Sequence, residues 1–219
     1  MSANICTTIK EYHKVTGLPL KGDLTKIENL SEDIKENMIK RMKLEAQVLK
    51  KNSSTINTLK AFEKVFSCRL SEDSWGLLDP KNIIEIYDFN FCQWYRNWTF
   101  YKISSYSLEQ LCMYPIWELY NRPTEITNKI VNEVMSLTQN DFNHTVPFEI
   151  PIHRLRELNP EKNNNGVTFN VDFKTISPVF DVETNEIKFV LTQAYVRPMG
   201  MLQKGNEDYF YDAASLSVV

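Results

Sequence analysis

The sequence predicts an α+β fold: an antiparallel sheet with helices grouped on one side, preceded by an N-terminal helical extension. In the first part of the chain, apolar residues recur at the three- and four-residue spacing of amphipathic helices. Later segments alternate apolar and polar residues, which is typical of half-buried strands. Composition changes in the same way, since eight of the nine prolines and all four tryptophans lie from Trp75 onward.

We divide the chain into a helical extension over 1–75, a folded domain over 76–200 and a C-terminal tail over 201–219. The extension holds 13 Lys and Arg against 10 Asp and Glu, a net charge of +3. The remaining 12 basic and 18 acidic residues give the rest a net charge of −6. A whole-chain charge of −3 provides no broad basic field, so we expect no nucleic-acid partner.

Three helices are expected in the extension. The first runs over 5–13 and stops at Gly17-Leu18-Pro19, the second starts at 31–33 with acids in its first turn, and the third starts at Ser53 or Ser54. Their narrow apolar stripes suit packing against the rest of the chain or contact with a second chain. Both readings stay open, and the helices in 31–69 are the expected contact in a homodimer or with a partner protein.

The second part of the chain predicts strands and helices in alternation. The expected elements are a strand over 82–91, helices over 108–120 and 124–137 with Thr124 as N-cap of the latter, a short strand over 146–150, a strand over 167–174, a turn over 181–186 and a strand over 187–196. In the first strand, Ile84 and Ile86 should face one side, and Ile83, Glu85 and Tyr87 the other.

Three short segments, together with this element order, resemble a PAS domain. Asn97 precedes a short helix; 105–111 (SYSLEQL) resembles the family's GYS-x-E-E-L segment, with Ser105 in place of Gly; and 177–187 resembles its P-I-x-D-x-x-G hairpin. Asn185 replaces the turn glycine there, and Asn also accepts left-handed backbone angles. The resemblance covers 80–198 and implies a PAS-like sheet, with the helix over 124–137 beside a ligand cavity.

The resemblance implies a non-catalytic sensory or regulatory module. It would bind a small ligand or a protein partner and signal through its helical extension and dimer contacts. One alternative is the sensor portion of a transcriptional regulator, with a DNA-binding surface on 31–69. A second is a small enzyme that uses the same cavity, and a third is a pure dimerisation scaffold.

Aromatic residues are concentrated between Trp75 and Trp117, which hold 12 of the 26 in the chain. Core packing accounts for many of these rings, and a cavity for a small apolar ligand is the more specific interpretation. The candidate cavity-lining residues are Trp94, Trp98, Tyr106 and Trp117.

No cofactor is identified from the sequence, and no catalytic residue is assigned. A PAS domain can hold haem through a histidine near the long helix; 124–137 has none, which leaves His144 as the haem candidate. The three histidines form no HExxH motif and no compact Cys/His cluster, so we expect no metal site.

The expected location is the cytoplasm. The N-terminus lacks the apolar core of a secretory signal, and no run of about 18 apolar residues predicts a membrane span. The four cysteines have no CxxC spacing and are expected to be reduced thiols.

Overall fold

The computed structural model describes residues 5–18, 20–51, 54–101, 103–139, 142–158 and 165–199. The expected tail over 201–219 lies outside these residues. The described residues form nine helices: α1 (Ile5–Thr16), α2 (Leu24–Glu28), α3 (Glu32–Lys51), α4 (Thr55–Phe66), α5 (Glu72–Leu77), α6 (Trp98–Tyr101), α7 (Leu108–Met113), α8 (Ile116–Leu119) and α9 (Thr124–Gln139). They also form eight strands: β1 (Cys68–Leu70), β2 (Ile83–Tyr87), β3 (Gln93–Arg96), β4 (Tyr120–Asn121), β5 (Val146–Pro147), β6 (His153–Leu158), β7 (Asn165–Asp181) and β8 (Ile187–Met199).

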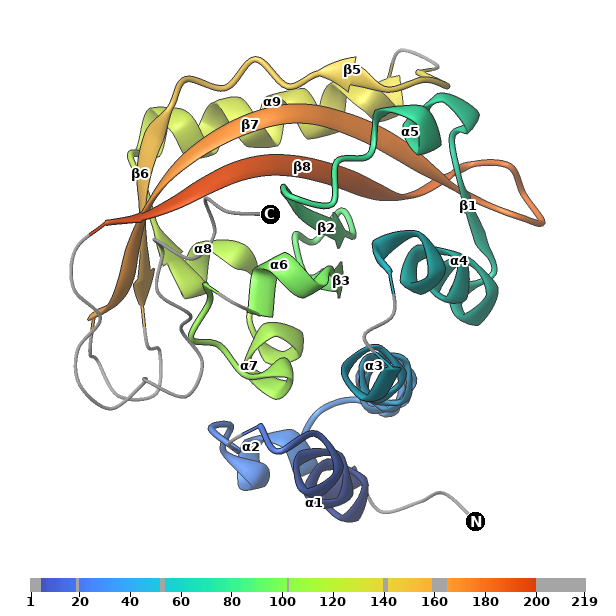
Figure 1. Ribbon diagram of the computed structural model, residues 1–219, viewed down its shortest axis with the longest axis vertical. Coiled ribbons are helices and arrows are strands. Elements are labelled where there is room, and N and C mark those ends of the chain that lie inside the picture. The colour runs from blue at the N-terminus through green and yellow to red at the C-terminus, as the bar shows by residue number, and fades with distance from the viewer. Residues whose placement is uncertain are drawn as a thin grey trace.

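The strands form one antiparallel sheet in the spatial order β3-β2-β8-β7-β6-β4, with β1 and β5 paired to β7. The hairpin of β7 and β8 contains the two longest strands of the sheet and is paired from Thr168 with Met199 to Phe180 with Ile187 (Figure 1). The turn between them contains Asn185 at a φ of 60°, so an asparagine does occupy the left-handed position there. The predicted α+β fold with an antiparallel sheet is confirmed.

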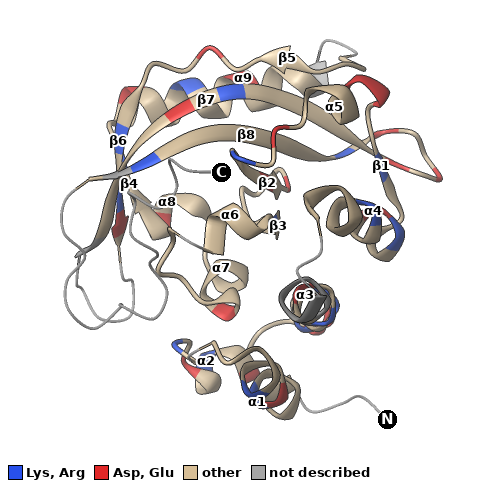
Figure 2. Cartoon of the chain, in the orientation of Figure 1, with Lys and Arg blue, Asp and Glu red and all other residues tan. Residues whose placement is uncertain are grey.

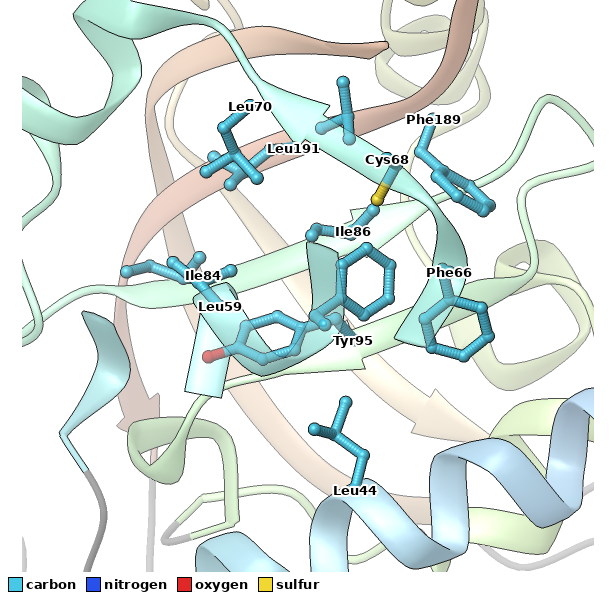
Figure 3. Packing of buried hydrophobic residues seen from close by; sticks show 12 residues of the cluster. Leu44, Leu59, Phe66, Cys68, Leu70, Ile84, Ile86, Tyr95, Phe189 and Leu191 are labelled. Carbon is cyan, nitrogen blue, oxygen red and sulfur yellow. The ribbon is translucent and has the colours of Figure 1, made fainter. Parts of the chain in front are cut away.

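One face of the sheet packs on α4. Ile84 and Ile86 of β2 point to this face, as the alternation predicts, and meet Phe62 of α4. The other buried members of this cluster, which we call the solid face, are Leu44, Leu59, Phe66, Cys68, Leu70, Tyr95, Val179, Phe189 and Leu191 (Figure 3). Its rings pack edge to face, with centroids 5.8 Å apart for Phe62 and Phe189.

The opposite face of the same strands packs on the helices that connect β3 to β6. Ile83 of β2 and Ala194 of β8 meet Phe100 of α6 and Leu119 of α8. Further along, Val190 of β8 packs with Ile130 of α9. The helices between β3 and β6 therefore lie on one side of the sheet, and α4 from the extension covers the other side over part of its length.

The N-terminal helices pack on this assembly through α3 and α7. Ile9 of α1, Met38 and Met42 of α3 and Leu108 of α7 form one buried cluster. Ser54 caps α4 by accepting a hydrogen bond from the Asn57 amide, which agrees with the expected helix start. Of the two interpretations of these helices, packing against the rest of the chain is therefore observed. Contact with a second chain stays a prediction.

Several expected boundaries need correction. The helix over 108–120 is two helices, because Pro115 cannot donate the hydrogen bond that would continue α7. Thr124 is the first residue of α9, not its N-cap, since the Pro123 carbonyl accepts from the Ile126 and Thr127 amides. The strand over 146–150 is only Val146–Pro147, and the sheet strand that precedes β7 is β6, which was not expected. Its sequence HRLREL carries charges on its exposed positions and two buried polar residues, so its apolar alternation is weak.

Two further features concern the chain as a whole. All four cysteines are described, and none forms a disulfide. Within the described ranges, no helix combines the length and the apolar character needed to cross a membrane.

Candidate ligand cavity

A cavity of about 70 Å³ lies between the sheet and the helices α6, α8 and α9. Its wall is mostly apolar, and three strands place alternate residues on it. The apolar wall residues are Ile83, Phe91, Phe100, Ile103, Ile116, Ile130, Val134, Phe148, Leu155, Phe169, Val171, Phe173, Val190, Ala194 and Val196. The polar or partly polar ones are Glu85, Tyr87, Ser104, Tyr120, Arg122 and Thr192.

The alternation of the strands explains why this wall is apolar. Phe169, Val171 and Phe173 lie on the cavity face of β7, and the polar residues between them face outward. On β8 the inward residues include Val190 and Ala194, while Leu191 between them belongs to the solid face. The residues predicted to alternate over 167–174 therefore do form a half-buried strand, and its buried side lines a cavity.

Polar groups lie among these apolar walls. The Tyr87 hydroxyl and the Gln93 side-chain amide both donate to Glu85 Oε1, each at 2.6 Å. Burial raises the pKa of the Glu85 carboxyl, although these two hydrogen bonds act in the opposite direction. Burial also lowers the pKa of Arg122, and the nearby Tyr87 and Glu85 oppose that effect. The cavity thus combines an apolar body with a carboxyl and a guanidinium group.

The size of the cavity limits what it can hold. A single buried water needs roughly 10–15 Å³ of such space, so 70 Å³ corresponds to about five non-hydrogen atoms. Pockets for drug-sized ligands are about 300–1,000 Å³. Without rearrangement, a haem or a flavin does not fit. The residues do not fit a haem chemically either, since no histidine or cysteine is among the wall residues given above.

The aromatic residues that the sequence singled out lie elsewhere. Trp94 packs on the solid face, 5.2 Å from the Phe189 ring, and its indole nitrogen donates to Asp88 Oδ2 at 2.9 Å. Tyr106 is buried against Tyr120 with ring centroids 5.3 Å apart, and its hydroxyl donates to the carbonyls of Leu119 and Leu158. Neither side chain reaches the cavity wall.

The other three candidates are on the surface. Trp98 is 36% exposed at the start of α6, and Trp117 is 48% exposed and packs on Phe91. His144 is exposed, with its Nδ1 3.2 Å from Asn143 Oδ1, and does not line the cavity. The structure therefore does not bring the five candidate residues together around one cavity. His144 faces solvent, so its position does not support it as a haem ligand in this cavity.

The concentration of aromatic residues between Trp75 and Trp117 did not identify the residues that line the cavity, but the alternation of residues along the strands could have done so. The expected split of β2 already placed Ile83, Glu85 and Tyr87 on the face away from Ile84 and Ile86, and all three line the cavity. Trp94 and Tyr95 are consecutive residues of β3, and both pack with the solid-face cluster. The missed signal is a carboxylic acid, Glu85, on the otherwise apolar side of a strand.

Ser105, which stands where the resemblance expects glycine, fixes the segment beside the cavity to β6. Its backbone nitrogen donates to Glu157 Oε1 at 2.9 Å, and its hydroxyl donates to Glu157 Oε2 at 2.5 Å. The Ser104 hydroxyl donates to Glu157 Oε1 at 2.8 Å. The Val167 amide of β7 also donates to Glu157 Oε2, at 3.3 Å. Burial raises the pKa of Glu157 against these hydrogen bonds, so a buried carboxyl is held here by four donors.

A buried ion pair connects the cavity wall to α3. Arg96 of β3 donates to both carboxylate oxygens of Glu45 of α3, at 3.0 and 3.1 Å. Its guanidinium lies 5.3 Å from the ring centre of Phe100, a cavity-wall residue. Burial raises the pKa of Glu45, but the charges of Arg96 and Arg41 outweigh it and lower the pKa, so the carboxylate is ionised. The Tyr12 hydroxyl of α1 donates to the same carboxylate at 2.8 Å.

No protein-family model and no curated protein matches the sequence. Among solved structures, the PAS-B domain of Cycle from Drosophila melanogaster, with bound ethylene glycol, aligns at 10% identity with a TM-score of 0.38. That alignment covers 52% of this chain and 99% of the domain. A PAS domain from Colwellia psychrerythraea aligns at 18% identity with a TM-score of 0.36, covering 64% of this chain and 96% of that one.

Those similarities concern the fold alone. The order of elements agrees with the expectation from the sequence: a strand and its hairpin partner, short helices, one long helix and an antiparallel set of strands. The first strand, β2, lies beside the last, β8.

Proposed function

We propose that this protein is a non-catalytic sensory module that binds a small, mainly apolar molecule in the cavity between the sheet and α6, α8 and α9. The observation that carries the proposal is the hollow between two apolar layers, with Glu85 and Arg122 among its wall residues. A molecule with an apolar body and one hydrogen-bonding group matches this wall.

The chemistry of the wall supports binding and not catalysis. Glu85 is hydrogen-bonded to Tyr87 and Gln93, and the cavity-wall residues contain no thiol or imidazole that could act as a nucleophile or base. A buried carboxyl with a raised pKa can still donate a hydrogen bond to a ligand when it is protonated.

Ligand occupancy would reach the N-terminal helices through Phe100 and Arg96. A molecule that displaces the Phe100 ring also displaces the face against which the Arg96 guanidinium packs. Arg96 is bound to Glu45, so a shift there acts on α3. A ligand can shift this packing only as far as it binds one arrangement better than the other.

Contact with a partner chain through the helices in 31–69 completes the proposal. Among the side chains of α3 and α4 that the structure describes, three apolar ones are exposed by 40% or more: Ile34, Ile56 and Val65. A homodimer would bury them. Sedimentation equilibrium over a wide concentration range tests this part, and a chain that remains monomeric at the highest concentration contradicts it.

Binding is tested with 1-butanol, which has five non-hydrogen atoms. We expect saturable shifts of the methyl NMR signals of Val171 and Val190 on titration, and their loss in Ala194→Leu, which fills the cavity. The matched control is Tyr195→Leu, because the next residue on β8 is 45% exposed on the other face. Unchanged binding in Ala194→Leu, or no saturable shift in the native protein, contradicts the proposal.

A further inference from the structure

Three arginines line a groove on the outside of the sheet, at the β4–β6 edge. They are Arg122, Arg154 and Arg156, and Asn121, Pro123 and Thr168 complete the wall of a depression of about 510 Å³. We call it the arginine groove. Its volume is within the range of pockets that hold peptides' side chains or small ligands, about 300–1,000 Å³.

Strand pairing brings these residues together. Arg154 and Arg156 are two residues apart on β6, so both point to the exposed face. Arg156 is opposite Asn121 of β4 on one side and Thr168 of β7 on the other. Figure 2 shows the basic positions of β6 at this edge of the sheet.

Arg154 and Arg156 are exposed, and Arg122 lies deeper, where Glu85 of the cavity wall acts on its charge. Among the residues that the structure describes, none of the three arginines has a carboxylate within 4.0 Å. The nearest acids along the paired strands are engaged elsewhere: Glu157 accepts from Ser105 in the interior, and Asp172 pairs with Lys174. The two exposed arginines of β6, with Arg122 at the wall of the same groove, create a site for an anionic group.

The chain itself supplies an anionic segment at the right place. β8 ends at Met199, which is opposite Thr168 in the wall of the groove. Seven residues further on begins the sequence over 206–212, NEDYFYD, with three acids, three aromatics and no basic residue. Eight residues of extended chain span roughly 26 Å, which is ample reach from Met199 to the groove.

We propose that the arginine groove binds the segment 206–212 of the same chain. Glu207, Asp208 and Asp212 match the three guanidinium groups in number and in sign, and charge-assisted pairs of this kind are the stronger hydrogen bonds in proteins. Tyrosine and phenylalanine rings also stack on guanidinium planes. Because Arg122 lines both the groove and the ligand cavity, the bound segment contacts a residue of the cavity wall.

Site-specific photo-crosslinking of the full chain tests the docking. With Phe210 replaced by p-benzoylphenylalanine, irradiation should attach position 210 to peptides that contain 121–123, 154–156 or Thr168, as read by mass spectrometry. Mixing isotopically light and heavy chains separates contacts within one chain from contacts between chains. Crosslinks mapped to other surfaces, or found only between light and heavy chains, overturn the proposal.

Charge variants provide the second readout. The double variant Arg154→Gln/Arg156→Gln should reduce the crosslink yield about fivefold, and raising the salt concentration should reduce it further. Lys60→Gln/Lys64→Gln removes the same charge from exposed positions on α4, away from the groove, and should leave the yield unchanged. Equal yields in the two double variants overturn the proposal, since both keep their buried packing and differ only in where the charge is lost.

Discussion

The two faces of the central sheet are built from the same strands but packed to different densities. On β8, Leu191 points to the solid face under α4, and its neighbours Val190 and Thr192 point to the cavity. On β2, Ile84 and Ile86 are fully buried against α4, and Glu85 between them lines the cavity. The difference shows that one face joins the extension to the sheet, and that the other encloses a cavity with polar groups in its wall.

Removal of a ring from the solid face should have the largest effect. Phe62 is completely buried between Phe66, Tyr95 and Phe189, so Phe62→Ala leaves a space that neighbours cannot fill. We expect a loss of about 3–5 kcal/mol in the free energy of unfolding, measured by urea denaturation. A loss below about 1.5 kcal/mol would mean that this face is not densely packed.

Breaking the ion pair between the two parts of the chain should cost nearly as much. Arg96→Met leaves the Glu45 carboxylate buried without its main partner, and such losses are about 3–5 kcal/mol. The triple variant Arg41→Met/Glu45→Met/Arg96→Met should recover most of that stability, because it removes the three buried charges of this cluster together. If the triple variant is as unstable as Arg96→Met alone, the cost comes from packing and the electrostatic account fails.

The link between α1 and α7 should make stability depend on pH. Both ring nitrogens of His13 face acceptors, Leu18 O at 2.8 Å and Glu109 Oε2 at 3.0 Å, so the doubly protonated ring satisfies both. Burial lowers the pKa of His13, but the hydrogen bond and charge of Glu109 outweigh it and the pKa is raised. Burial likewise raises the pKa of Glu109, and the hydrogen bond from His13 helps to lower it to about 2.

The direction of each pKa shift determines how the free energy of unfolding changes with pH. The His13 contribution is complete below its ordinary pKa of about 6.5 and is lost as the pH rises through the raised value. The Glu109 contribution is complete above about pH 4.5 and is lost as the pH falls toward 2, by about 2–3 kcal/mol. Urea denaturation across pH 2–9 should show both losses, and Glu109→Gln should flatten the acid side. An unchanged acid slope in Glu109→Gln contradicts this assignment.

Enlarging a side chain should distinguish the two faces by a smaller amount. Leu191→Phe adds volume where the solid face has none to spare, and we expect a loss of about 1–3 kcal/mol. Ala194→Leu, on the same strand, extends into the cavity and should cost less than about 1 kcal/mol. Thermal denaturation of the two variants side by side gives the comparison, and equal losses would show that the two faces are packed alike.

Periodicity carried most of the fold prediction. The alternation in β2 and β7 assigned residues to the correct faces, and the turn at Asn185 and the cap at Ser54 marked element ends through local backbone chemistry. β6 was missed because His153 and Glu157 are buried polar residues on its inner side, which weakens the apolar signal. The partner of Glu157 is distant in sequence, at Ser105, so no local pattern reveals that contact.

The cavity wall was harder to predict for the same reason. Trp94 is partly buried and Tyr106 is buried, as expected for rings in a core, but which core they join depends on the strand face and on the path of the chain around α7. Phe148 and Phe169 reach the cavity from segments that the ring count between Trp75 and Trp117 never included. A cavity depends on how the sheet and the helices pack against each other, and no local sequence pattern marks it.

Xenon binding tests the hollow face most directly, because xenon enters small apolar cavities and is seen directly by diffraction. In crystals under xenon pressure, we predict one strong xenon peak among Ile83, Phe169 and Val190 in the native protein, and none there in Ala194→Leu. An empty site in the native protein, or an equal peak in both proteins, would contradict the account.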